Sequence, residues 1–253
     1  MAGSPHNPLP LEVEPPVMTP HTPQTLPEEA RRGARWPDGC HQELEVKLLA
    51  TPALIARVRE SAMIKELAVR PPSTLVLVNI YYDTPSRWFA AHDLILRVRS
   101  DGQRHILGLK SRGEARQGLF RRWEIEHVVA SPRPDMTMVA AILADGFAME
   151  APANIAPLFE TRFTRIEFAL DVPGGPDGDA GRVALAFDEG AIVAGARTET
   201  IAEIELELVS GPEAALTELA GRLVAAYGLR YGGASKAHRG YRLADEALAD
   251  GVV

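Results

Sequence analysis

Charged and apolar side chains alternate from Glu43 to Leu48 in the segment 42–49 (QELEVKLL). Alternation with a period of two is typical of a β-strand, because successive side chains of a strand project to opposite faces. Glu43, Glu45 and Lys47 therefore share one face, and apolar residues occupy the other. Such a strand needs a cover for its apolar face and surroundings that tolerate several charges on its polar face.

The same pattern recurs later in the chain, with charges of one sign on each polar face. The residues are Arg97 and Arg99, Glu124 and Glu126, and Glu203, Glu205 and Glu207, with Lys110 on the strand expected after the two arginines. For any single strand, a solvent-facing antiparallel sheet is the alternative explanation. However, same-face neighbours lie ~7 Å apart, where two carboxylates repel by roughly 2 kcal/mol at an effective dielectric near 20. Faces that stack like charges need something to offset this repulsion.

Two kinds of ligand would offset it. Divalent cations such as Mg²⁺ prefer carboxylate oxygens, and a polyanion would neutralise the arginines and lysines. Mg²⁺ usually binds through one or two carboxylates together with substrate phosphates, so both ligands belong to one site. The sequence therefore predicts a barrel whose charged faces point inward and whose apolar faces are covered outside by helices.

The rest of the pattern supports many antiparallel strands with a few helices between them. Strands are expected over 42–49, 74–83, 93–100, 104–111, 119–129, 158–171, 182–188, 191–197 and 201–209. Helices are expected over 52–68, 135–145 and 213–227, with a short helix that starts near Ser235. This content predicts an α+β fold built on a barrel or a strongly curved sheet.

The first 38 residues differ from the rest because prolines are concentrated there. Proline fixes φ and removes a backbone donor, so neither a helix nor a sheet runs through such a segment. We predict a disordered proline-rich tail over 1–38, with partner docking as the alternative, and a folded domain over 39–253.

Composition limits the partners and the compartment. With 27 basic and 34 acidic side chains the net charge is -7, which argues against non-specific nucleic-acid binding but allows a local basic cavity. The single cysteine, Cys40, excludes an internal disulfide and favours a reducing compartment. No stretch approaches the roughly 20 apolar residues of a membrane span, and no signal-peptide pattern opens the chain. We expect a cytoplasmic protein without a membrane partner.

Several common catalytic motifs are absent from the sequence. It has no GxxxxGK[ST] phosphate loop, no GxGxxG fingerprint, no GxSxG nucleophile elbow and no HExxH zinc motif. The stretch 176–181 resembles the start of a twelve-residue calcium-binding loop, but no glutamate follows at the twelfth position of such a loop. A hairpin turn is therefore expected there.

The run Glu43-Leu44-Glu45-Val46-Lys47 matches the ExExK signature of CYTH domains, the triphosphate tunnel metalloenzymes. Further matching runs are NIYYDTP at 79–85, LRVR at 96–99, IELELVSG at 204–211 and SKAHRGY at 235–241. The chain thus resembles this family over about 41–246, and bacterial inorganic triphosphatases in particular. The resemblance implies an eight-stranded antiparallel barrel, a tunnel lined by acidic and basic residues, with helices packed outside.

The resemblance also implies roles for individual residues. The metal ligands, for Mg²⁺ or Mn²⁺, would come from Glu43, Glu45, Glu203, Glu205, Glu207 and Asp188. The phosphates would be held by Lys47, Arg97, Arg99, Lys110, Arg165, Lys236 and Arg239. Lys47, Glu124 and Glu126 would act in catalysis, the two glutamates by orienting the bases or by taking part at the metal. Which of Glu203, Glu205 and Glu207 bind metal stays open. Where many members carry a basic residue two positions before Arg165, this chain has Phe163.

The activity that the resemblance implies is metal-dependent hydrolysis of inorganic triphosphate to pyrophosphate and phosphate. Hydrolysis of thiamine or nucleoside triphosphates, cyclisation of ATP and non-catalytic binding of polyphosphate are the alternatives. An aromatic content of 6% offers no obvious stacking platform for an organic ring. The oligomeric state stays open, with a homodimer as one alternative.

Overall fold

The structure is a computed structural model that describes residues 40–116, 118–174 and 178–251. The tail predicted to be disordered over 1–38 lies outside the described residues. Residue 39, where the folded domain is predicted to begin, lies outside them too. So does most of the glycine-rich turn near 174–178, because residues 175–177 are not described.

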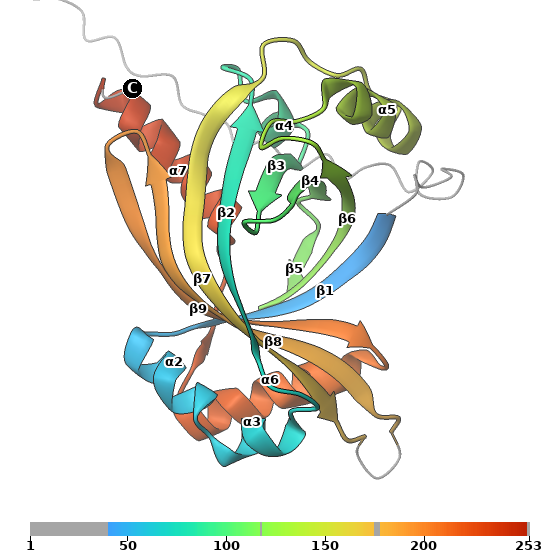
Figure 1. Ribbon diagram of the computed structural model, residues 1–253, viewed down its shortest axis with the longest axis vertical. Coiled ribbons are helices and arrows are strands. Elements are labelled where there is room, and N and C mark those ends of the chain that lie inside the picture. Colours follow the sequence, from blue (N-terminus) through green and yellow to red (C-terminus); the bar gives the residue numbers. More distant parts are fainter. Residues whose placement is uncertain (1–39, 117, 175–177, 252–253) are drawn as a thin grey trace, which may run out of the picture. The chain divides into compact units, whose positions relative to one another are not determined.

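Eight antiparallel strands pair side by side and close into a ring (Figure 1). They are β1 (Cys40–Leu49), β2 (Ser73–Asp83), β3 (Leu94–Ser100), β4 (His105–Ser111), β6 (Leu119–Val129), β7 (Ala156–Val172), β8 (Gly181–Ala194) and β9 (Arg197–Ser210). The order around the ring is β1-β9-β8-β7-β2-β3-β4-β6, and β6 pairs back with β1. The predicted eight-stranded antiparallel barrel is confirmed.

Strand β1 closes the ring because it pairs with two neighbours in succession. Its residues from Cys40 to Val46 face β6, and those from Glu45 to Leu49 face β9. Two short strands, β5 (Glu114–Arg116) and β10 (Arg230–Tyr231), pair with β6 and β1 respectively.

The separate strands expected over 182–188 and 191–197 are a wrong prediction. Strand β8 runs unbroken from Gly181 to Ala194, and the hairpin falls at Gly195, whose φ of 55° suits glycine. Gly190 lies inside this strand. A Cβ at this position would come within 2.1 Å of the Arg162 carbonyl oxygen, which explains why the residue is glycine. This glycine marks a close approach of two backbones and not a turn.

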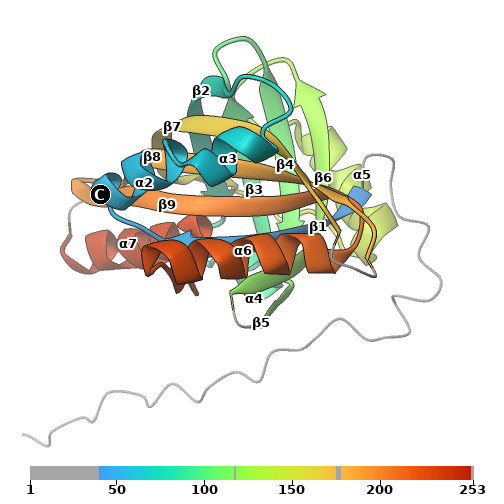
Figure 2. The same cartoon turned by 90° about the horizontal axis from the view of Figure 1, so that it is seen from below.

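Helices cover one outer side of the ring. Helices α2 (Pro52–Arg59), α3 (Ala62–Leu67) and α6 (Glu213–Tyr227) lie against β1, β7, β8 and β9 (Figure 2). Between them is a buried apolar cluster to which β1 contributes Leu44, Val46 and Leu48. Complete burial of such a side chain stabilises the fold by about 1.5–3 kcal/mol. The apolar face of β1 therefore points outward into this cluster, as predicted.

The helix expected over 52–68 is two helices. Helix α2 ends at Arg59, and Ser61 begins α3 by accepting a 3.3 Å hydrogen bond from the Ile64 amide. A serine at this position competes with the helix backbone for hydrogen bonds, which favours a new N-terminus over continuation.

The other helices complete the cover. Helices α4 (Trp88–Ala91) and α5 (Met136–Phe147) contribute to an apolar cluster with β3, β4 and β6. Helix α7 (Lys236–Ala249), longer than the short helix expected near Ser235, packs against an apolar cluster of β7 and β8 that includes Phe159 and Ile192. Among the helices that the structure describes, none combines the length and the apolar character needed to cross a membrane.

Candidate functional site: a charge-lined cavity

The charged faces of the strands enclose a cavity of about 140 Å³. The predicted site residues that line it are Glu43, Glu45, Lys47, Arg97, Arg99, Lys110, Glu124, Glu126, Arg165, Glu205, Glu207 and Lys236. Asp188 and Glu203 are buried behind this lining and contact Lys236. Arg239 lies farther along α7, 2.6 Å from Glu199 and 3.3 Å from Glu203. The structure thus brings together residues that the alternation of the strands singled out with residues that only the family resemblance implied, such as Arg165 and Lys236.

One group of ion pairs joins β1, β3, β4 and β6. The Glu43 carboxylate accepts from Arg122 Nε at 2.6 Å and from Lys110 Nζ at 3.1 Å. Lys110 Nζ also lies 2.6 Å from Glu124, which in turn accepts from Arg97 at 2.8 Å. Because each carboxylate meets more than one cation, Lys110 and Arg122 hold the pKa of Glu43 well below its usual range despite its burial.

A second group joins β7, β8, β9 and α7. The Lys236 ammonium lies 2.7 Å from Asp188 and 2.8 Å from Glu205, and it also contacts Glu203. Arg165 donates to Asp188 at 2.8 and 2.7 Å and to Glu205 at 2.6 Å. Burial opposes the charge of Lys236, but its carboxylate neighbours outweigh burial and raise the pKa of the ammonium.

Lys47 connects the two groups. Its Nζ donates to Glu45 on its own strand and to Glu205 on β9. Burial opposes its charge, yet Glu205 and Glu45 raise the pKa of this lysine. A cation at this position keeps two buried carboxylates from repelling each other across the β1–β9 pair.

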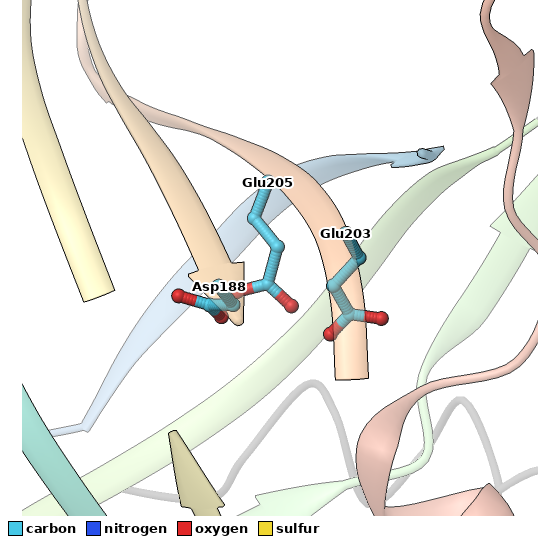
Figure 3. A group of neighbouring side chains, drawn as sticks. All are labelled: Asp188, Glu203 and Glu205. Carbon is cyan, nitrogen blue, oxygen red and sulfur yellow. The ribbon is translucent and has the colours of Figure 1, made fainter. Parts of the chain in front are cut away.

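Three carboxylates are arranged in a way that fits a divalent cation. Asp188 on β8 and Glu203 and Glu205 on β9 each offer an oxygen, and these oxygens all lie within 4.8 Å of one another (Figure 3). Asp188 and Glu203 face each other across the β8–β9 pair, while Glu205 is two residues farther along β9. Oxygen ligands of this charge are those that Mg²⁺ and Mn²⁺ prefer. The donor set therefore fits the predicted metal.

Arg122 is a cavity residue that the sequence interpretation missed. It is buried, donates to Glu43 and Glu45, and lines the cavity. The signal was present, because Arg122 stands two residues before Glu124 and so shares its face of β6. Arg122 does not fit the pattern of one charge sign on each strand face, because Glu124 and Glu126 on the same face of β6 are both acidic.

Phe163 occupies the inward position at which many family members carry a base. Its ring lies 5.0 Å from Lys236 Nζ and 5.8 Å from the Arg165 guanidinium carbon, distances typical of cation–π contacts. Arg162 is exposed and pairs with Glu160 at 2.6 Å. This strand therefore presents one cation to the cavity, and its aromatic ring packs against two.

Glu207 differs from the other carboxylates that line the cavity. Among the described residues, no lysine or arginine nitrogen lies within 4.0 Å of its oxygens. Burial, reinforced by the charge of Glu43, raises the pKa of Glu207 to about 7. Because of this pKa, Glu207 exchanges a proton near neutral pH.

The fold and the cavity define a class of protein, a closed antiparallel tunnel that gathers carboxylates suited to a divalent cation beside cations suited to a polyanion. The chain belongs to the CYTH domain family, which matches residues 41–241. The match confirms the family resemblance of the sequence motifs.

Individual proteins of known name are similar to the chain as well. An inorganic triphosphatase of Haemophilus influenzae is 29% identical over 203 residues, which are 80% of this chain and 55% of that protein. The chain therefore spans about half the length of that curated relative. A Hippeastrum protein studied as an adenylyl cyclase, which has a dominant triphosphatase activity, superposes with a TM-score of 0.51 at 19% identity. The superposition covers 83% of this chain and 97% of that one and shows a shared fold.

Proposed function

We propose that this protein hydrolyses inorganic triphosphate to pyrophosphate and phosphate in a reaction that depends on Mg²⁺ or Mn²⁺. The observation that carries the proposal is a cavity lined by arginines and lysines that fit phosphate, next to a carboxylate cluster that fits a divalent cation and reaches the cavity through Glu205. Membership of the CYTH family and similarity to an inorganic triphosphatase support it.

Basic side chains would hold the substrate. The residues proposed for this role are Lys47, Arg97, Arg99, Lys110, Arg165, Lys236 and Arg239, together with Arg122. Arginine binds phosphate oxygens in a bidentate manner, and interactions of buried charges are weakened less by water than those at the surface. Apart from Arg99, the cations that line the cavity contact carboxylates in the described structure, so phosphate would take over contacts that carboxylates now make.

Carboxylates would hold the metal. Asp188, Glu203 and Glu205 form the proposed ligand set, and Glu43, Glu45 and Glu207, which line the cavity, are further candidates. A divalent ion bound there would neutralise charge on phosphoryl oxygens and lower the pKa of a bound water.

The chain's own groups would contribute to the reaction by position and charge. Water would attack the terminal phosphorus in line, the bond to the bridging oxygen would break, and pyrophosphate would leave. We assign Lys47 to the stabilisation of charge on the phosphoryl oxygens. Glu124 and Glu126 lie 2.8 and 3.0 Å from one Arg97 nitrogen and would orient that guanidinium towards the substrate.

The cavity favours a compact polyanion over a nucleotide or thiamine ester. Its volume of about 140 Å³ is small beside the roughly 300–1,000 Å³ of pockets that enclose drug-sized ligands. Its aromatic residues are also engaged elsewhere, since Tyr81 stacks on Phe159 at 4.4 Å and Phe163 packs against two cations. Both rings therefore already have packing partners.

The decisive experiment is phosphate release from inorganic triphosphate, ATP and thiamine triphosphate, each with Mg²⁺, with Mn²⁺ and with a chelator. Fast release from inorganic triphosphate alone, abolished by the chelator, is the expected result. Preference for an organic triphosphate, or production of cyclic AMP from ATP, would change the substrate assignment. A folded sample that binds polyphosphate and releases nothing would overturn the enzymatic proposal.

Two matched variants test where the metal acts. Glu203→Gln removes one charge from the proposed ligand set and keeps the size of the side chain, so turnover should fall at least 100-fold. Glu60→Gln makes the same change at an exposed position on the outside of the ring and should leave turnover unchanged. Equal activities of these two variants would contradict the metal assignment.

A further inference from the structure

Arg99 is exceptional among the cations that line the cavity. Lys47, Arg97, Lys110, Arg122, Arg165 and Lys236 each contact at least one carboxylate. Within the described part of the chain, no carboxylate oxygen lies within 4.0 Å of an Arg99 nitrogen. Arg99 is half-buried, and a guanidinium shielded from water without a counter-ion is costly. Its partial burial together with nearby Arg97 lowers the pKa of Arg99.

A neutral group holds this arginine instead of a carboxylate. Arg99 Nε donates a 3.1 Å hydrogen bond to Oδ1 of Asn79, and Nδ2 of Asn79 donates a 3.0 Å hydrogen bond to Oγ1 of Thr161. Asn79 is 1% exposed and Thr161 is fully buried. The three residues form a row across adjacent strands, because Asn79 on β2 lies opposite Arg99 on β3 and opposite Thr161 on β7.

The row fixes the direction of the asparagine amide. Arg99 Nε can only donate, so the amide oxygen of Asn79 faces it, and the amide nitrogen donates to the Thr161 hydroxyl on the other side. An amide oxygen orients a guanidinium by one hydrogen bond and leaves its positive charge uncompensated. An aspartate of the same shape would pair with the guanidinium and cancel that charge.

We infer that Asn79, supported by Thr161, is a positioning residue that keeps Arg99 oriented and unpaired with any carboxylate. Arg99 is thereby already available to bind a phosphate group when the ligand enters the cavity. This inference rests on the proposed function in taking triphosphate as the ligand. At the other cations phosphate must displace a carboxylate, whereas at Arg99 it meets a cation that is already placed and without a counter-ion. Loss of the arrangement should therefore weaken binding more than it slows the chemical step.

The test compares Asn79→Asp with wild type in the full chain. Binding of inorganic triphosphate is measured by calorimetry with a chelator present, and KM and kcat are measured with Mg²⁺. We expect Kd and KM to rise at least tenfold, kcat to change less than threefold, and the melting temperature to stay level or rise because a new ion pair forms. An unchanged Kd and KM in a folded Asn79→Asp protein would overturn the inference.

A second pair of variants keeps the test sharp if Asn79→Asp does not fold. Thr161→Val removes the acceptor of the Asn79 amide nitrogen, so Asn79 loses one of its two hydrogen bonds and holds Arg99 less firmly, and KM should rise two- to fivefold. Thr161→Ser restores the hydroxyl and should bring KM back towards the wild-type value. Thr164→Val makes the same change at an exposed position of β7 and serves as the control. Identical KM values for Thr161→Val and Thr161→Ser would contradict the inference.

The outcomes separate this inference from the proposed function. If wild type hydrolyses triphosphate and the Asn79 and Thr161 variants bind it normally, only the positioning role fails. If wild type binds triphosphate without hydrolysis and these variants bind it more weakly, the positioning role stands and the enzymatic proposal fails. A wild-type protein that does not bind triphosphate would overturn both.

Discussion

Tyr241 on α7 donates a 2.8 Å hydrogen bond to Oδ2 of Asp83, the last residue of β2. The other oxygen of this carboxylate accepts from the amides of Thr84 at 2.7 Å and Phe89 at 2.9 Å. One buried carboxylate therefore ties α7, which carries Lys236, to the end of β2 and the start of α4. Burial, with the negative charge of Asp83, raises the pKa of Tyr241, so the phenol stays a donor.

Tyr241→Phe should destabilise the fold. The ring remains in place against Phe159, but a hydrogen bond to a charged acceptor is lost, which costs about 1.5–3 kcal/mol. Urea denaturation measures the change in the free energy of unfolding. Tyr231→Phe, at a tyrosine that is 43% exposed, should change it by less than about 0.5 kcal/mol. If the two variants were equally stable, the hydrogen bond from Tyr241 would have no role in holding α7.

Stability should depend on pH through Glu207. Its pKa is raised to about 7 in the folded protein, from about 4.5 in the unfolded chain, so the folded state binds the proton more strongly. Stability contributed by this group is therefore full below pH 4.5 and is lost as pH rises through 7. Glu207→Gln removes the titration and should be more stable than wild type by about 3 kcal/mol at pH 8, but not at pH 4.5.

The measurement is urea unfolding of both proteins between pH 4.5 and pH 8.5, with a chelator present. The difference between their unfolding free energies isolates Glu207 from the other carboxylates. The exposed Glu218→Gln serves as the control and should show no such difference. A difference that is flat across this range would contradict the raised pKa.

Arg122→Gln should be strongly destabilising in the absence of metal. Removal of Arg122 takes one cation from Glu43 and one from Glu45, and a broken buried ion pair typically costs about 3–5 kcal/mol. Added Mg²⁺ should raise the melting temperature of this variant more than that of wild type, because the metal would neutralise the carboxylate charge that Arg122 no longer balances. Its neighbour Arg121 is half-exposed and pairs with Glu213, so Arg121→Gln is the matched control.

Lys236→Met should bind Mn²⁺ about tenfold more tightly than wild type. The ammonium of Lys236 lies among Asp188, Glu203 and Glu205 and competes with a metal ion for the same oxygens. The same variant should bind triphosphate less tightly, because it loses a proposed phosphate contact. Titration calorimetry with Mn²⁺ alone measures the first effect. An unchanged Mn²⁺ affinity would mean that these three carboxylates do not hold the metal.

Some predictions about the protein have no test in the structure. The cytoplasmic location, the absence of a nucleic-acid partner, the homodimer and the disordered tail over 1–38 all stay predictions. The roles of individual site residues stay proposals, although the positions of those side chains are now known.

The alternation of charged and apolar residues already predicted the barrel and most of the charged side chains that line its cavity. The difference between the two faces of β1 follows from local sequence, because the two-residue period of a strand places Glu43, Glu45 and Lys47 on one side. The division of 52–68 into two helices and the continuous course of β8 were missed. Ser61 begins α3 through a local hydrogen bond, whereas the need for glycine at 190 is set by the neighbouring strand, whose Arg162 carbonyl lies close to it.

Only the tertiary structure determines which charged side chains form ion pairs with one another. Lys47 meets Glu205, 158 residues away, and Arg122 meets Glu45, 77 residues away, because ring closure places β1 between β6 and β9. The row from Thr161 through Asn79 to Arg99 likewise requires the register of three strands. Local periodicity tells which face a side chain takes, whereas its partner depends on strand order and register, which long-range packing sets.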